Sequence, residues 1–107
     1  IITKDEIIYM IEGTFTLLEE NRKFWKLYFS IIPQPEVFNI VKDIMNEYLE
    51  YFFGLFESYF ENAGYEDPKA EALILGSIMD GIGFHYLLNA EGYPMESVKR
   101  KLINMYK

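Results

Sequence analysis

Apolar residues in this chain recur at intervals of three and four residues, and nowhere do they alternate over the length of a β-strand. That spacing places them on one side of an α-helix, which has 3.6 residues per turn. Prolines, glycines and capping residues interrupt the pattern and divide the chain into helical segments. We expect five helices, covering about residues 3–20, 22–32, 36–62, 68–89 and 94–106. The sequence therefore predicts an all-α, bundle-like single domain over residues 1–107.

Local signals fix the ends of these helices. Thr3-Lys4-Asp5-Glu6 is a capping box that begins the first helix. Pro33-Gln34-Pro35 ends the second, because proline lacks the amide hydrogen and disfavours helix in the residue before it. Gly64 can adopt the left-handed conformation that closes the third helix, and Asp67-Pro68 supplies an N-cap and a first-turn proline for the fourth.

The segment 36–62 carries a polar arc and an opposite, much wider apolar arc that includes Val41, Ile44, Tyr48 and Phe56. An arc that wide must contact several helices and not a single coiled-coil partner.

The segment 68–89 is apolar nearly all the way round after Glu71, so we expect it to be covered on two sides. Ala72, Gly76 and Gly83 form a strip with almost no side chain, which allows another helix to approach closely. That helix belongs either to the same chain or to a second copy, and the pattern favours neither. Asp80 lies among apolar neighbours and needs an interhelical or intersubunit hydrogen bond.

Composition excludes several classes of protein. The chain has 107 residues, no cysteine and a net charge of −7, which argues against disulfide scaffolds, thiolate sites and direct nucleic-acid binding. Acidic residues interrupt every long apolar stretch, so we expect no membrane span, and no signal peptide opens the chain. A cytoplasmic protein is the simplest expectation. The start at Ile1-Ile2, directly before a helix, indicates a fragment of a longer protein.

The inventory of reactive residues argues against an enzyme. His85 is the only histidine, so a di-iron bundle with two Glu-x-x-His pairs is excluded. No serine lies in a nucleophile elbow, and no glycine-rich phosphate loop is present. We expect no catalytic residue, no metal and no cofactor, and for His85 a structural role is favoured over ligand binding.

Nine Phe, nine Tyr and one Trp exceed what an ordinary core of this size needs. Aromatic residues of segment 22–32 are placed to face those of segment 36–62 around an apolar cavity, with tyrosine hydroxyls and His85 as its few polar groups. The candidate ligand-binding residues are Trp25, Tyr28, Phe29, Tyr48, Phe52, Phe56 and His85. The alternative is that these side chains simply fill the core.

Two motifs carry a resemblance to a known family. Residues 65–72 (YEDPKAEA) followed by 79–88 (MDGIGFHYLL) resemble the penultimate helix of the C-terminal domains of TetR-type bacterial transcriptional regulators. Residues 93–99 (YPMESVK) resemble the start of their last helix. The likeness covers residues 64–107 well. Upstream it extends only to the order of the helices and to segment 21–35.

The resemblance implies a ligand-sensing and dimerising domain of a regulator, most simply a repressor, whose small apolar or amphipathic effector binds between the middle helices. Operator DNA would be read only by an N-terminal helix-turn-helix that this chain lacks. The last two helices of each subunit would form a four-helix interface in a homodimer. Its candidate residues are Ala72, Gly76, Met79, Asp80, Gly83, Leu87, Met95, Val98, Leu102 and Met105. A helical protein-interaction module without a small ligand is the alternative.

Overall fold

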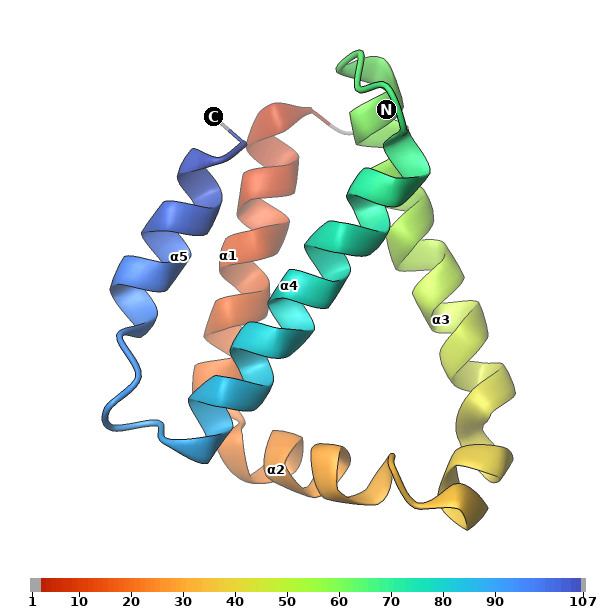
Figure 1. Cartoon of the computed structure of the whole chain (residues 1–107), viewed down its shortest axis with the longest axis vertical. Helices are drawn as coiled ribbons and strands as arrows, with labels where there is room; N and C mark the ends of the chain where they lie inside the picture. The colour runs from red at the N-terminus through yellow and green to blue at the C-terminus, as the bar shows by residue number, and fades with distance from the viewer. Residues whose placement is uncertain (1–2, 107) are drawn as a thin grey trace.

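Five helices and no strand make up residues 3–106, the part of the chain that the computed structural model describes (Figure 1). They are α1 (Lys4–Glu20), α2 (Arg22–Ile31), α3 (Pro35–Asn62), α4 (Pro68–Leu88) and α5 (Met95–Asn104). The all-α, bundle-like fold is therefore confirmed. The predicted bounds are right to within one residue for the first four helices, whereas α5 ends two residues earlier than expected.

Hydrogen bonds at the helix ends explain this agreement. The Thr3 hydroxyl accepts from the Glu6 amide at 3.2 Å, and Asp67 accepts in the same way from the Ala70 amide at 3.2 Å. The Glu6 carboxylate also accepts from the Thr3 hydroxyl, so the two side chains of the predicted capping box are joined. Gly64 has a φ of 86°, and the amide that follows it, in Tyr65, donates to the Phe60 carbonyl. This is the expected glycine stop.

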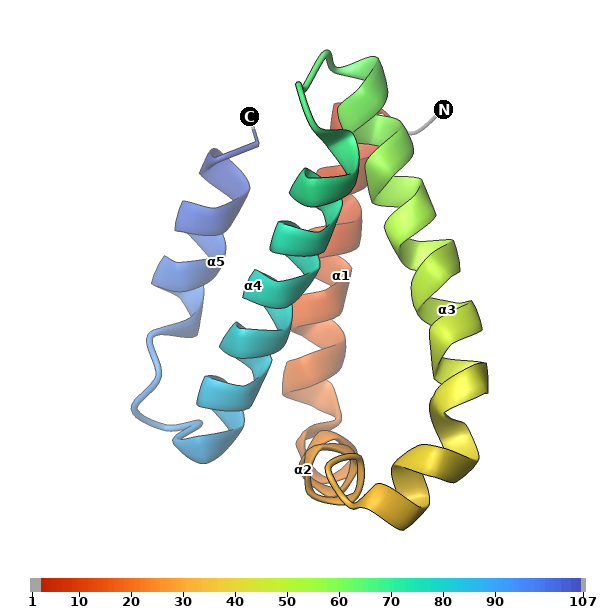
Figure 2. The same cartoon turned by 45° about the vertical axis from the view of Figure 1, so that its right-hand side comes forward.

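The helices form a triangle in the view of Figure 1. α4 crosses in front of α1, and α5 runs along the outer side of this pair. α3 lies close to α4 near the loop that joins them and diverges from it toward the other end, as both views show (Figure 2). α2 lies across the open end and connects α1 to the start of α3. This divergence leaves the middle of the triangle to be filled by side chains.

The core lies where α1, α4, α5 and the last turns of α3 meet. α2 contributes no buried residue. The Phe60 ring is fully buried and packs edge-on against Tyr65, with ring centroids 4.8 Å apart. The core residues are Ile7, Ile11, Phe15, Leu18, Phe56, Tyr59, Phe60, Ala72, Leu75, Tyr86, Leu87, Met95, Leu102, Ile103 and Tyr106.

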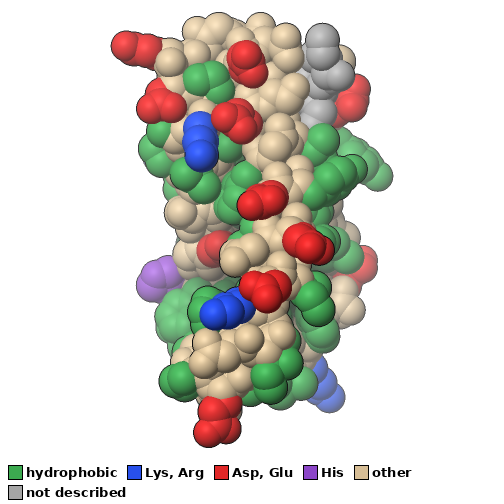
Figure 3. Space-filling view, turned by 90° about the vertical axis from the view of Figure 1, so that its right-hand side faces the viewer, with side chains coloured by type: hydrophobic (Ala, Val, Ile, Leu, Met, Phe, Trp, Pro, Cys, Tyr) green, Lys and Arg blue, Asp and Glu red, His purple; other side chains and the backbone are tan. Residues whose placement is uncertain are grey.

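The wide apolar arc of α3 is covered only in part. Its C-terminal end packs on α4 and α1, and its first turns approach α2, which confirms contact with several helices. The arc is not buried along its whole length, however: Ile44 remains 71% exposed and Tyr48 62% exposed. The physical reason is the divergence of α3 from α4. Acidic side chains follow the outward face of α3, with apolar side chains on either side (Figure 3).

The small-residue strip of α4 faces the interior of its own chain. A Cβ atom at Gly76 would overlap the Phe53 ring of α3, and one at Gly83 would lie 3.6 Å from Leu18 of α1. Of the two alternatives for the close approach, the structure thus shows the intramolecular one.

α4 is also long and apolar enough to cross a membrane by length and composition alone. The prediction that no segment reaches this threshold is therefore wrong, because Glu71 and Asp80 are too few acidic residues to lower the hydropathy of the helix below it. Core helices of globular proteins that are mostly buried meet the same criterion. In α4, Ala72 and Leu75 are buried in the core described above, and 28% of the apolar window is buried.

Candidate functional site

A cavity of about 380 Å³ lies inside the triangle, between α1, α2, α3 and α4. Most of its surface is apolar, and no residue of α5 takes part. α1 provides Tyr9, Met10, Gly13, Thr14, Leu17 and Leu18, and α2 provides Trp25 and Phe29. α3 provides Tyr48, Leu49, Phe52, Phe53 and Phe56, and α4 provides Gly76, Met79, Asp80 and Gly83.

Five of the seven predicted ligand-binding residues line this cavity: Trp25, Phe29, Tyr48, Phe52 and Phe56. Phe56 is also a buried member of the core, so for this residue the two interpretations hold together. The indole N–H of Trp25 donates to the Leu17 carbonyl at 3.3 Å, which fixes α2 to the end of α1. The Tyr48 and Phe52 rings lie side by side on α3, with centroids 4.6 Å apart.

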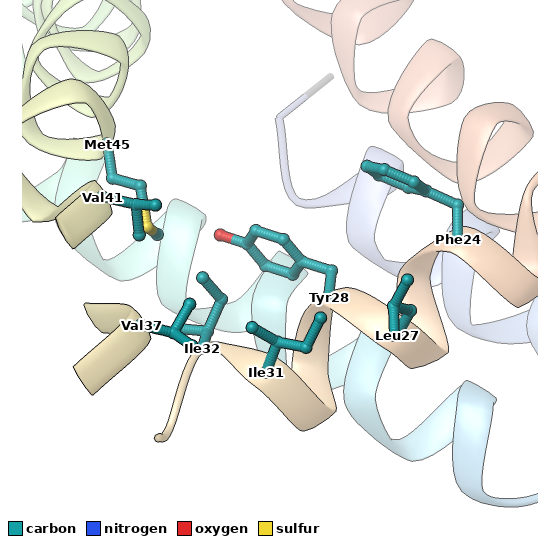
Figure 4. A pocket seen from close by; sticks show the side chains of 8 residues that line it. All are labelled: Phe24, Leu27, Tyr28, Ile31, Ile32, Val37, Val41 and Met45. Atoms are coloured by element: carbon teal, nitrogen blue, oxygen red, sulfur yellow. The ribbon is translucent and has the colours of Figure 1, made fainter. Parts of the chain in front are cut away.

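Tyr28 lies in a second, smaller cavity of about 280 Å³ between α2 and the start of α3. Its hydroxyl points toward α3, on the side where Val41 and Met45 lie (Figure 4). The other residues around this cavity are Phe24, Leu27, Ile31, Ile32 and Val37, so its walls are almost wholly apolar.

The placement of His85 at the cavity is wrong. The side chain is exposed, lines neither cavity, and has the Phe84 ring as its aromatic neighbour, with centroids 5.9 Å apart. The residues of α4 that face the main cavity are spaced three and four apart, from Gly76 to Gly83. At about 100° per residue, a side chain two positions after Gly83 points to the opposite side of the helix.

Asp80 is the main polar group that the cavity offers. Its carboxyl remains accessible to solvent, yet apolar neighbours desolvate it and raise its pKa above the ordinary value. The pKa of Tyr28 is also raised, first by burial, then by the negative charge of Asp80 and by Tyr48. These three groups are therefore near one another, where α2, α3 and α4 face the same space.

Asp80 does not have the hydrogen bond that its apolar surroundings predict. Within residues 3–106, the one ion pair joins Lys99 to Glu96 on α5, and no side-chain hydrogen bond reaches the Asp80 carboxylate. Thr14 of α1 also lines the cavity, but its hydroxyl donates to the Met10 carbonyl of its own helix at 2.9 Å.

The candidate dimer residues lie mostly inside the single chain. Ala72, Leu87, Met95 and Leu102 are buried in the core, and Val98 is half-buried. The four candidates Gly76, Met79, Asp80 and Gly83 line the cavity. Of the ten candidates, Met105 alone is a large apolar side chain that is exposed. A surface open to a second copy therefore does not consist of the predicted set.

The apolar residues that α4 leaves exposed are Leu73, Ile74, Phe84 and Leu88. The sequence pattern did not single them out, because a helix that is apolar all round does not reveal which of its sides faces outward. Comparisons with models of protein families, with curated proteins and with solved structures found no match to this chain. The likeness to TetR-type regulators rests on the motifs quoted above.

Proposed function

We propose that this chain is the effector-binding and dimerisation domain of a TetR-type bacterial transcriptional regulator, most simply a repressor. The observation that carries the proposal is the cavity between the first four helices, which is lined by aromatic rings from α2 and α3. Apolar walls with few polar groups are the usual composition of a small-molecule site. The effector in this proposal is a small apolar or amphipathic molecule.

In this proposal, α1 connects the cavity to the DNA-reading part of the parent protein. It supplies the lining residues from Tyr9 to Leu18, and in the family the helix-turn-helix precedes the helix that corresponds to it. An effector that binds one position of α1 better than another shifts the population toward that position. The spacing of the two DNA-reading parts in a dimer would change with it, and the operator would be released.

The dimer of this proposal uses the outward side of α4. Leu73, Ile74, Phe84 and Leu88 remain 44–68% exposed there, and large exposed apolar groups on one helix favour association. A two-fold dimer would bring this side against the same side of a second copy.

Ligand binding is tested by the melting temperature of the chain in the presence of hydrophobic amphiphiles. A ligand that binds only the folded state at a hundred times its Kd should add about 2.7 kcal/mol to the free energy of unfolding. The Phe52→Ala variant should lose most of this shift, since Phe52 lines the cavity. Phe38→Ala is the matched control, because Phe38 lies on α3 outside both cavities and is 45% exposed.

A helical interaction module without a small ligand is the second candidate. It is favoured by the first half of α3, where Ile40 is 78% and Ile44 71% exposed. The module predicts that no amphiphile changes the melting temperature. It also predicts that Ile40→Ser abolishes association with a protein partner, while Phe52→Ala leaves association intact.

A further inference from the structure

Asp80 is the only residue in the lining of the main cavity that carries a full charge. The other lining side chains are aliphatic, aromatic or neutral polar groups, and neither lysine, arginine nor histidine is among them. The carboxylate comes from the middle of α4, between Gly76 and Gly83, which line the cavity with it.

The protein itself does not neutralise this charge. Among residues 3–106 no cation pairs with Asp80, and none of the other residues that line the cavity carries a positive charge. A carboxylate among apolar walls is costly unless it acquires a partner. A positively charged ligand would be that partner.

The rings around the cavity add a second attraction for the same kind of ligand. Trp25 and Phe29 approach from α2, and Tyr48, Phe52 and Phe56 from α3. The faces of aromatic rings carry partial negative charge and attract cations, with tryptophan and tyrosine among the strongest. The Tyr48 and Phe52 rings are tilted by 51° to each other, so the wall that they form is not flat.

We infer that the cavity binds a lipophilic organic cation, whose charge is held by Asp80 and whose apolar groups contact the aromatic rings of α2 and α3. The inference rests on the proposed function, because it names the ligand class of the same cavity. It also narrows the ligand class from apolar or amphipathic molecules in general to those that carry a positive charge. An anionic amphiphile such as a fatty acid would bring a second negative charge next to Asp80, in a chain whose net charge is already −7.

Tetraphenylphosphonium and tetraphenylborate test the inference, because they have the same shape and opposite charge. Triphenylphosphine oxide serves as the neutral probe. Calorimetric titration of the chain at pH 7.5 should give a higher affinity for the phosphonium ion than for the other two. Asp80→Asn should weaken phosphonium binding by roughly fivefold or more and leave the neutral probe unaffected.

Two further variants distinguish binding at the Asp80 site from the non-specific attraction of a cation to an acidic chain. Asp43→Asn removes the same charge from an exposed position on α3 outside both cavities, and should change the phosphonium affinity by less than about twofold. Phe52→Leu keeps an apolar side chain but removes a ring, so it should lower the affinity for the phosphonium ion more than the affinity for the neutral probe. This second variant keeps the test decisive if Asp80→Asn does not fold.

The possible results separate the two proposals. Equal affinities for the three probes, or equal losses in Asp80→Asn and Asp43→Asn, would overturn the cation site and leave an apolar effector cavity standing. Absence of binding for all three probes would overturn both.

Discussion

The pKa of Asp80 reflects the apolar surroundings of its carboxyl group. Its position on α4 points the carboxylate toward apolar and aromatic side chains, and the desolvation that results raises its pKa above the ordinary value of 3.8. The folded chain therefore binds more protons than the unfolded chain in the interval between the ordinary pKa and the raised one. The free energy of unfolding falls as the pH rises through this interval and stays lower above it.

Asp80→Asn should stabilise the chain at pH 7, because it removes a charge that the fold desolvates. The gain should be less than about 1 kcal/mol, since the carboxyl is accessible to solvent and its interactions are screened. It should vanish at pH values below the ordinary pKa, where Asp80 is neutral in both states. Urea denaturation at pH 7 and pH 3 measures both effects, with Asp43→Asn as the control. A variant that is less stable than the wild type at pH 7 would show that Asp80 has a favourable partner.

Residues whose roles are local were predictable from the sequence alone. Thr3, Asp67 and Gly64 act on backbone groups within a few positions, so the pattern of neighbouring residues is enough to identify them. The partner of Asp80 was not predictable in this way. Apolar neighbours in the sequence predict a partner for the carboxylate, but only the arrangement of the helices shows that Asp80 faces the cavity instead of a polar side chain.

Among the helices, α4 combines two roles that its composition does not separate. One side carries Gly76 and Gly83 against α3 and α1, and another carries the exposed Ile74 and Leu88. A helix that is apolar all round predicts burial on two sides. It does not predict which side faces the chain's own core, and for this reason most of the proposed dimer residues proved to lie inside.

Gly76→Ala should reduce the capacity of the cavity at a modest cost in stability. The new Cβ would overlap the outer atoms of the Phe53 ring, which also lines the cavity, so the ring must turn into the empty space. The higher helix propensity of alanine, up to about 1 kcal/mol, partly offsets the cost. Thermal melts with and without tetraphenylphosphonium should show a nearly unchanged melting temperature and a smaller shift on binding.

Gly81→Ala is the matched control on the same helix. A Cβ at Gly81 meets no atom within 4 Å, so this variant should gain up to about 1 kcal/mol and bind as the wild type does. If Gly76→Ala also bound normally, Phe53 would not limit the size of the cavity.

At the scale of the whole molecule, the divergence of the helices determines which side chains are exposed more than the sequence pattern of each helix does. Ile44 and Phe56 belong to the same apolar arc, yet Ile44 is 71% exposed and Phe56 only 5%. Nothing in their local sequence distinguishes them. The difference arises because α3 leaves α4 along its length, and this divergence also creates the cavity (Figure 1). The sequence predicted that aromatic residues gather here, but not which of them remain outside.

Association of two copies through α4 predicts a clear effect of charge at its outward side. The double variant Ile74→Glu/Leu88→Glu should be monomeric by light scattering at concentrations where the wild type is a dimer, because like charges would meet across the two-fold axis. Ile40→Glu/Ile44→Glu places the same charges on exposed residues of α3 and should remain a dimer. A monomeric wild type at high concentration would refute the dimer.

α2 should be the helix whose backbone exchanges hydrogen fastest among α1, α2 and α4. It has no buried residue, and within residues 3–106 the indole of Trp25 makes its one hydrogen bond to another helix. Regions with few buried contacts open locally at low free energy. Amide exchange measured by mass spectrometry should show early labelling of residues 22–31, and tetraphenylphosphonium should slow it because Trp25 and Phe29 line the cavity. Labelling of α2 as slow as that of α1 would contradict this.

α2 contributes no residue to the core, so we expect its local opening and the global unfolding of the chain to have separate rates. Because Phe60, Leu75 and the rest of the core lie elsewhere, α2 can detach and return while the packed helices stay in place. On the proposed function, we expect a ligand to exchange with the cavity at a rate set by this local opening, and not by global unfolding. The two rates should then respond to different substitutions, the first to changes in α2 and the second to changes in the core.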